Sequence, residues 1–341
     1  MVCNTMRKLI SILFLSAILV SCSEVMPEEK AYELQIPSGF DVPQIPEDNI
    51  LTDAKIALGK KLFYSTALSV DSTISCASCH RPENAFADHL AISHGVMGRT
   101  GFRNAPSLQN VAWYTVITMD GGNPSLETQP YVPIETHEEM GFNMVLLCER
   151  LNTDAEMVTS FNDVFGSNPD PYGVTRALAA FERTMISGNS RYDQYAYQGN
   201  IHALTAEELQ GKDLFFSDAL GCANCHSGFL FTNNTFENNG FFSDYSADSG
   251  RARITWLHED VGKFKVPSLR NVGVTAPYMH NGQVETLDEI IDMYAAGGSG
   301  HENQSVFITG FSITPAEKEA LKAFLLSLTD ISFMQNPDLL E

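Results

Sequence analysis

The sequence is short of positive charge. Its 341 residues include 21 Lys and Arg against 42 Asp and Glu, which gives a formal net charge of −21 at pH 7. A surface this acidic repels the phosphates of nucleic acids and of anionic lipids. We therefore expect no nucleic-acid partner, whereas a protein with a basic or neutral surface would be attracted.

The sequence also lacks a long apolar run. Residues 9–20 form an apolar stretch that follows Arg7 and Lys8, and no comparable run occurs later in the chain. A transmembrane helix needs about 20 apolar residues, so this stretch is too short to span a membrane. Its length and basic flank are typical of a signal peptide. We therefore expect an exported protein without a membrane-spanning helix in its mature form.

The apolar stretch ends in a sequence that resembles a bacterial lipobox, Leu19-Val20-Ser21-Cys22. We expect a lipoprotein signal peptide over residues 1–21, lipidation of Cys22, and a polar tether over residues 22–50. The mature protein would then lie on the periplasmic side of the bacterial cell envelope, held to the membrane by its lipid alone. The alternative is an ordinary signal peptide that is cleaved elsewhere.

Cysteine is scarce for an exported protein, with seven in the chain, which excludes a disulfide-rich scaffold. Cys3 lies in the signal peptide, and Cys148 lies in an apolar stretch, where we expect an inert buried thiol. Apart from Cys22, the remaining cysteines form two C-x-x-C-H motifs: Cys76, Cys79 and His80, and Cys222, Cys225 and His226.

The spacing within each motif is that of a haem attachment site. Two thiols separated by two residues reach the two vinyl groups on one edge of a haem, and the adjacent His lies beneath the iron as its proximal ligand. A zinc site or a thioredoxin-like site would need further Cys or His residues at a suitable spacing, and the sequence has none. The sequence therefore predicts two covalently bound c-type haems.

The two motifs lie within an internal repeat. Residues 59–65 recur as residues 211–217 before the second motif, and residues 106–111 recur as residues 267–272 after it. Matched blocks in the same order indicate duplication of one haem-binding unit. We expect an N-terminal domain over residues 51–198, a C-terminal domain over residues 199–330, and a tail over residues 331–341.

Signals that open helices are frequent. They occur at Thr205 with Glu208, at Thr286 with Glu289, and at Thr314 with Pro315 and Glu317. Residues 177–186 predict another helix, whereas the Gly- and Asn-rich residues 120–124 and 233–240 predict loops. Few strand patterns appear. We expect a mainly α fold of two cytochrome c-like haem domains, related by duplication, with long loops.

Over residues 50–330 the chain resembles the bacterial di-haem cytochrome c peroxidase and MauG superfamily. The resemblance rests on the two haem motifs and on residues 103–106 (RNAP), 181–184 (FERT), 186–189 (ISGN), 275–282 (TAPYMHNG) and 286–298. It implies an oxidoreductase with a peroxidatic N-terminal haem and a C-terminal haem at which electrons enter. The expected reaction is reduction of hydrogen peroxide to water with electrons from a small cytochrome c or cupredoxin. A homodimer is the assembly that we leave as an open alternative.

The resemblance also assigns residues to the first haem. His94 matches a distal His that ligates the iron in the resting state and swings away on activation, and His89 is its competitor. Glu139 matches the distal carboxylate, and Gln129 matches the distal amide. Such a carboxylate can move a proton between the two oxygens of peroxide, and an amide can orient the bound oxygen. Without the resemblance, Glu139 would be interpreted as a surface charge among neighbouring acidic residues.

Further assignments concern the region between the haems and the second haem. Asn104, Thr275 and Pro277 match a calcium site formed by one amide and two backbone carbonyls. Where the peroxidases have a Met as the distal ligand of the second haem, this sequence has Tyr294, as MauG has a Tyr. Met293 is the neighbouring residue. Adjacent helical residues point about 100° apart, so only one of these two can ligate the iron. A phenolate would favour the ferric state and lower the potential of the second haem.

One departure from the family and two alternative functions stay open. Met119 stands where the family has a Trp between the haems, so an aromatic relay is missing at that place. A MauG-like enzyme would use peroxide to oxidise a protein or an organic substrate, and Tyr294 favours this alternative. A non-catalytic electron carrier would have no iron position that is open to exogenous ligands.

Overall fold

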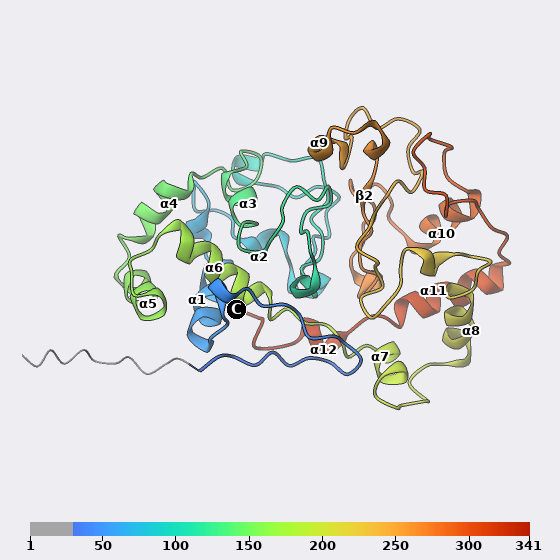
Figure 1. Ribbon diagram of the computed structural model, residues 1–341, viewed down its shortest axis with the longest axis horizontal. Helices are drawn as coiled ribbons and strands as arrows, with labels where there is room; N and C mark the ends of the chain where they lie inside the picture. Colours follow the sequence, from blue (N-terminus) through green and yellow to red (C-terminus); the bar gives the residue numbers. More distant parts are fainter. Residues whose placement is uncertain (1–29) are drawn as a thin grey trace, which may run out of the picture. The chain divides into compact units, whose positions relative to one another are not determined.

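Helices provide most of the regular structure in the computed structural model, which describes residues 30–341 (Figure 1). The α-helices are α1 (Asp53–Tyr64), α2 (Cys76–Cys79), α3 (Tyr131–Glu135), α4 (Met144–Leu151), α5 (Ala155–Phe165), α6 (Pro171–Glu182), α7 (Arg191–Ala196), α8 (Ala206–Phe215), α9 (Ala252–Thr255), α10 (Leu287–Ala296), α11 (Pro315–Leu326) and α12 (Ile331–Met334). In this part of the chain no helix has the length and apolar character needed to cross a membrane. The predicted signal peptide, Cys22 and the start of the tether lie outside the described residues.

Strands are short and few within residues 30–341. β1 (Phe236–Glu237) pairs antiparallel with β2 (Phe264–Lys265), with Phe236 opposite Lys265. Residues 120–124 form a loop as predicted, and residues 233–240 form a loop that contains β1. The prediction of a mainly α fold with long loops is confirmed.

The helices predicted from capping signals begin where the sequence places them. Thr205, Thr286 and Thr314 each accept a hydrogen bond from the backbone N–H of the Glu three residues later, and α8, α10 and α11 follow directly. The helix predicted at residues 177–186 exists, but its bounds differ. α6 begins at Pro171, because the Asp170 side chain caps it by accepting from the backbone N–H of Gly173 at 2.7 Å, and it ends at Glu182.

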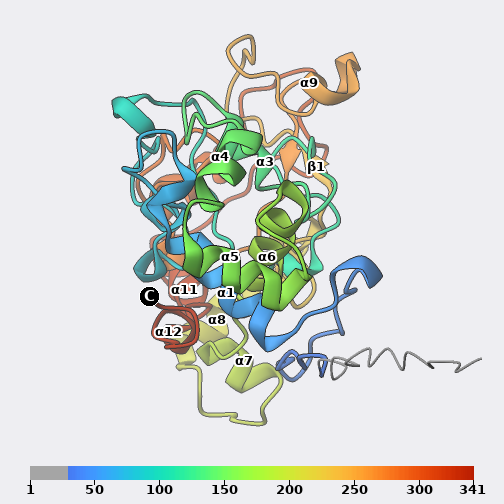
Figure 2. The same cartoon turned by 90° about the vertical axis from the view of Figure 1, so that its left-hand side faces the viewer.

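Two equivalent helix pairs lie side by side in both views of the molecule, α1 with α6 and α8 with α11 (Figures 1 and 2). A glycine makes each close approach possible. A Cβ atom at Gly59 would overlap the carbonyl oxygen of Ala177, and a Cβ atom at Gly211 would overlap that of Ala320. Gly59 and Gly211 belong to the repeated sequence block, so the repeat encodes this packing.

Each helix pair also packs on a cluster of buried phenylalanines. The ring centroids of Phe63 and Phe181 lie 5.3 Å apart, and those of Phe215 and Phe324 lie 5.2 Å apart. A third ring completes each cluster at 6.2 Å and 5.9 Å from the first ring. The members are Phe63, Phe86 and Phe181 in the first half, and Phe215, Phe231 and Phe324 in the second. The duplication seen in the sequence therefore extends to the core.

Buried polar side chains join the two halves. Asn110 Oδ1 accepts from the backbone N–H of Ser187 at 2.9 Å, and Asn271 Oδ1 accepts from that of Asp330 at 2.6 Å. Asn271 Nδ2 also donates to Ser187 Oγ at 2.9 Å and to Gln109 Oε1. All five residues are buried. Because hydrogen bonds are stronger in an environment of low dielectric constant, this network holds the halves in a fixed relation.

The last residues of the chain return to the first half. Phe333 of α12 lies 5.5 Å from Phe86 between ring centroids, and Leu339 belongs to the same buried cluster. The hydroxyl of Tyr64 on α1 donates to the carbonyl of Leu339 at 2.7 Å. Residues 331–341, which we expected to be a tail, thus complete the core around α1.

Replacing Gly59 or Gly211 with Ala should destabilise the protein, because the added Cβ has no room between the paired helices. Overpacking of this kind costs about 1–3 kcal/mol. We expect the urea midpoint of unfolding to fall in both variants. Gly101→Ala is the control, since a Cβ at Gly101 would meet nothing within 4 Å. Equal midpoints for the Gly59→Ala and Gly101→Ala proteins would contradict the close packing.

Candidate functional site

Each C-x-x-C-H motif forms one tight helical turn. In α2 the backbone N–H of His80 donates to the carbonyl of Cys76 at 2.9 Å. In the second motif the backbone N–H of His226 donates to the carbonyl of Cys222 at 3.0 Å. None of the four motif thiols forms a disulfide, so all four are free for covalent attachment.

A backbone carbonyl orients each motif histidine. His80 Nδ1 lies 2.9 Å from the carbonyl oxygen of Phe86, and His226 Nδ1 lies 3.2 Å from that of Phe231. Both phenylalanines have a left-handed backbone, with φ of 60° and 53°, which is rare for a bulky side chain. Because Nδ1–H donates to the carbonyl, Nε2 is the nitrogen that stays free to bind a metal.

Burial keeps both histidines neutral. It lowers the pKa of His80, and it lowers the pKa of His226 to about 4, although carbonyl hydrogen bonds oppose both shifts. A neutral imidazole is the form that ligates a metal. The two rings are therefore ready for ligation at neutral pH.

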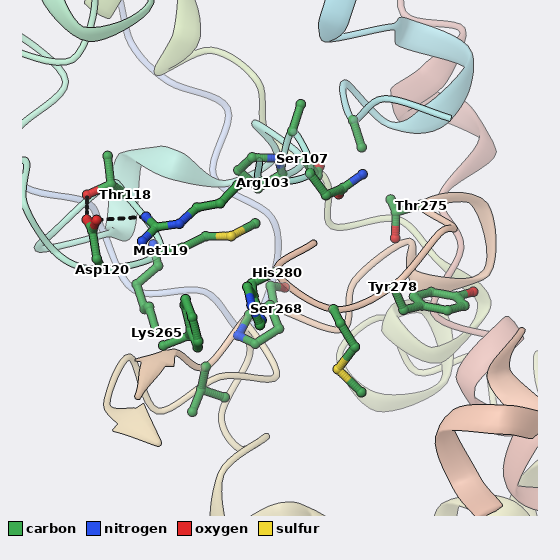
Figure 3. A pocket seen from close by; sticks show the side chains of 18 of the residues that line it. Arg103, Ser107, Thr118, Met119, Asp120, Lys265, Ser268, Thr275, Tyr278 and His280 are labelled. Carbon is green, nitrogen blue, oxygen red and sulfur yellow. Dashed lines mark hydrogen bonds and ion pairs between the residues drawn. The ribbon is translucent and has the colours of Figure 1, made fainter. Parts of the chain in front are cut away.

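Both motifs line one continuous cavity of about 1320 Å³. Pockets for one small ligand measure roughly 300–1,000 Å³, so this cavity can take more than one large group. Leucines of both halves, such as Leu178 and Leu321, give it apolar walls. Figure 3 shows Arg103 of the first half and His280 of the second half within this region. Free thiols, neutral histidines and apolar walls fit two covalently bound haems.

Glu139 and Gln129 both line the cavity, and the charge of Glu139 acts on the thiols of Cys76 and Cys79 in the first motif. The Glu139 side chain is exposed, but nearby protein atoms partly desolvate its carboxyl, and this desolvation, with Glu138 adding to it, raises the pKa of the carboxyl. Gln129 Oε1 is buried without a hydrogen-bond partner among the described residues. The cavity thus holds a weakly acidic carboxyl and an amide oxygen that lacks a donor.

His94 does not share this cavity. Its side chain is exposed, while its neighbours Ser93 and Gly95 line the cavity. A Cβ at Gly95 would overlap the carbonyl oxygen of Glu138, so the loop lies directly against the segment that carries Glu139. His89, the competitor, lies 3.2 Å from an oxygen of Asp88 and does not line the cavity either.

The residues matched to a calcium site lie in the wall of the same cavity. Asn104, Thr275 and Pro277 all line the cavity, and Figure 3 shows Thr275 there. Asn104 Nδ2 donates to the carbonyl of Leu90 at 2.9 Å, which leaves Oδ1 as the free amide oxygen. Within residues 30–341 no group of three or more His, Cys, Asp or Glu side chains is placed to hold a metal ion. A cation between the halves would therefore bind to amide and carbonyl oxygens.

The two candidate ligands of the second haem differ in position. Tyr294 of α10 lines the cavity, whereas its neighbour Met293 does not. Burial raises the pKa of Tyr294 to about 12, and a hydrogen bond with Asn239 opposes the rise. The geometry therefore favours Tyr294 over Met293.

A lysine and a tyrosine lie beside the position at which the family has a Trp. Met119 lines the cavity, and its carbonyl accepts from the backbone N–H of Lys265 at 2.7 Å. Lys265 Nζ lies 3.8 Å from the ring centroid of Tyr114 and donates to the carbonyl of Val116 at 3.0 Å. Figure 3 shows Met119 and Lys265. Burial lowers the pKa of Lys265 to about 7. Trp113 does not line the cavity.

Sequence reasoning missed one acidic residue of the cavity wall. Glu182, the last residue of α6, lines the cavity and is 7% exposed. The FERT string contains it but gives it no role. A residue-by-residue comparison of α6 with α11 would have drawn attention to it, because the equivalent position in α11 is Leu325.

Comparison with known proteins relates most of the chain to proteins of one family. Residues 53–201 match the family model described as di-haem cytochrome c peroxidase. The chain is 36% identical over 288 residues to the methylamine utilization protein MauG of Methylorubrum extorquens, covering 83% of this chain and 80% of that protein. It is 32% identical over 327 residues to a cytochrome-c peroxidase of Denitromonas iodatirespirans, covering 86% and 87%.

Solved structures share the fold. A MauG-like protein associated with microbial copper homeostasis superposes with a TM-score of 0.86 at 32% identity, covering 91% of this chain and 99% of that protein. The di-haem peroxidase BthA of Burkholderia thailandensis superposes with a TM-score of 0.73 at 23% identity, which shows a common fold.

Proposed function

Because this chain belongs to the di-haem cytochrome c peroxidase and MauG family, and so binds two haems, we propose that it reduces hydrogen peroxide at the haem held by Cys76, Cys79 and His80. The observation that supports this most is the pair of polar side chains, Glu139 and Gln129, in the same cavity as the first motif. The haem supplies the redox chemistry at this site.

Glu139 performs the proton transfer in this proposal. It accepts the proton of one peroxide oxygen and delivers it to the other, which leaves as water. Two electrons and two protons convert one peroxide into two waters. Gln129 orients the substrate through its amide, whose oxygen lacks a donor in the protein. The raised pKa of Glu139 suits this role, since a base works best when its pKa approaches the operating pH.

Electrons enter through the haem held by Cys222, Cys225 and His226, in the domain of residues 199–330. A small cytochrome c or a cupredoxin supplies them, and the net charge of −21 would attract a basic donor. The peroxidatic domain spans residues 51–198.

His94 ligates the first iron in the resting protein and leaves on activation. Its exposed position agrees with the arrangement after departure.

The mature protein is periplasmic and is anchored by lipid on Cys22. If a Cys22→Ser protein were still retained at the membrane, this anchor would be refuted.

A MauG-like reaction is the second candidate, and the cavity position of Tyr294 favours it. A tyrosinate ligand stabilises the more oxidised states of iron. Peroxide would then oxidise a protein or an organic substrate, and no small electron donor would be consumed.

The function is tested by following peroxide consumption by the haem-loaded protein with a reduced cytochrome donor, before and after pre-reduction. Donor-dependent turnover supports the peroxidase. Peroxide-induced changes of the haem spectrum without donor turnover would favour the MauG-like reaction instead. If the resting spectrum of a His94→Gly protein equals that of the wild type, His94 is not a ligand of the first iron. Absence of any reaction would reject both enzymes.

Glu139→Gln should lower kcat by about 10²–10⁴-fold, the usual range for loss of a general base, while both haems stay attached. In the wild type, kcat/KM should fall as the pH falls through the pKa of Glu139, because only the carboxylate accepts a proton. That pKa is raised, so the fall begins above the range of an ordinary glutamate. Glu149→Gln, on the exposed side of α4, is the control. Unchanged turnover in Glu139→Gln would refute its role.

We also propose that Asn104, Thr275 and Pro277 bind calcium, through the free amide oxygen and two backbone carbonyls. Because these ligands come from both halves, the ion would fix the halves at the cavity. Chelation should lower peroxide turnover, and added Ca²⁺ should restore it. Full activity after chelation, with elemental analysis showing no calcium, would reject the site.

A further inference from the structure

The two equivalent helix pairs allow a residue-by-residue comparison of the cavity walls. Gly59 contacts the backbone of Ala177 in α6, and Gly211 contacts that of Ala320 in α11, so these two helices are in register. One residue further on, Leu178 corresponds to Leu321, and both line the cavity.

At the next position that lines the cavity, α6 and α11 have different types of residue. One helical turn after Leu178 and Leu321, α6 has Glu182 and α11 has Leu325. Both residues line the cavity, and both are 7% exposed. Leu325 demonstrates that an apolar side chain satisfies this position in the fold. The carboxyl in the first half therefore needs an explanation other than packing.

The protein compensates the buried carboxyl of Glu182 only in part. Its Oε2 is buried without a hydrogen-bond partner among the described residues. Burying an unpaired carboxyl in this way is costly. The adjacent cation, Arg183, is already engaged, because its guanidinium forms a two-bond ion pair with Glu127. Glu182 lines the cavity that both haem motifs share.

Burial favours the neutral form of Glu182. Burial raises the pKa of Glu182 to about 8, with Arg183 opposing the rise and Glu127 adding to it. Glu182 also has the largest charge effect on the thiol of Cys76, and Glu139 acts on that thiol more weakly. Since Cys76 would attach the first haem, Glu182 is placed to respond to the charge of that haem.

We propose that Glu182 binds a proton when the first haem is reduced and releases it when that haem is oxidised. One electron from the reductant lowers the positive charge of the iron, which raises the proton affinity of the nearby carboxylate. The carboxylate then takes one proton from water in the cavity and becomes a carboxylic acid. On oxidation the O–H bond breaks, and the proton returns to water. The inference needs haem at the first motif and does not depend on peroxide turnover.

The measurable consequence is a potential that depends on pH. If one proton accompanies one electron, the midpoint potential of the first haem falls by up to about 59 mV per pH unit. The dependence is expected between the pKa of Glu182 in the oxidised protein and its pKa in the reduced protein. The second haem, with Leu325 at the equivalent position, has no such group there.

The test is a spectroelectrochemical titration of the haem-loaded protein from pH 5 to pH 9, in the wild type, Glu182→Gln and Glu182→Leu. Gln preserves the shape of the side chain, and Leu is the residue that α11 already uses. Two midpoint potentials are followed in each protein. We expect one of them to lose most of its pH dependence in both variants, while the other is unchanged. Glu149→Gln, with an exposed carboxyl on α4, should leave both dependences as in the wild type.

Either of two results would overturn the inference: a pH-independent pair of potentials in the wild type, or wild-type pH dependence in the Glu182→Gln protein. The result of this titration does not depend on whether the protein reduces peroxide. A protein without peroxide turnover can still show a pH-dependent potential that Glu182→Gln removes. Conversely, active peroxidase with unaltered potentials in Glu182→Gln would reject only the role of Glu182.

Discussion

The constraint on which this structure depends is a cavity that its own side chains do not fill. Residues of α6, α10 and α11, together with long loops and both haem motifs, line about 1320 Å³ of mainly apolar space. A compact protein tolerates unfilled apolar space poorly, because the lining atoms lose their packing partners. The haems are therefore part of the core as well as its reactive centres. The left-handed backbone at Phe86 and Phe231 also contributes to haem binding, because it directs a carbonyl to each haem-ligating histidine.

The features that the two halves share and the residues in which they differ lie in different parts of the structure. Features that build the enclosure are equivalent in the two halves: the glycines in the helix contacts, the phenylalanines, and the carbonyls that orient the histidines. Differences gather where chemistry would occur. Asn104 corresponds to Lys265, and Glu182 corresponds to Leu325. Glu139, which lines the cavity with Gln129, acts on the charges of the thiols of the first motif, Cys76 and Cys79. One scaffold thus presents two haem motifs in surroundings of different polarity.

The sequence predicted those parts of the fold that depend on local signals. The haem motifs, the helix starts at Thr205, Thr286 and Thr314, and the duplication follow from residue type and spacing. It could not place His94, because the direction of a loop side chain depends on contacts such as that of Gly95 with the segment of Glu139. Nor could it isolate Glu182. An acidic residue at the end of a helix resembles a surface charge until the packing of α6 on α1 shows that it is buried. The ligation roles of His94 and Tyr294 stay predictions.

The buried amide network has a consequence for modularity. Asn271 donates to Ser187 of the other half and to Gln109, and Asp330 accepts from the hydroxyl of Ser187. If one half were excised, the other would expose polar groups that evolved to meet a partner, together with the apolar surface that Phe333 now covers. What began as two copies of an independent unit has become a single indivisible body. Neither copy can be exchanged for an ordinary single-haem cytochrome without rebuilding the contact between them.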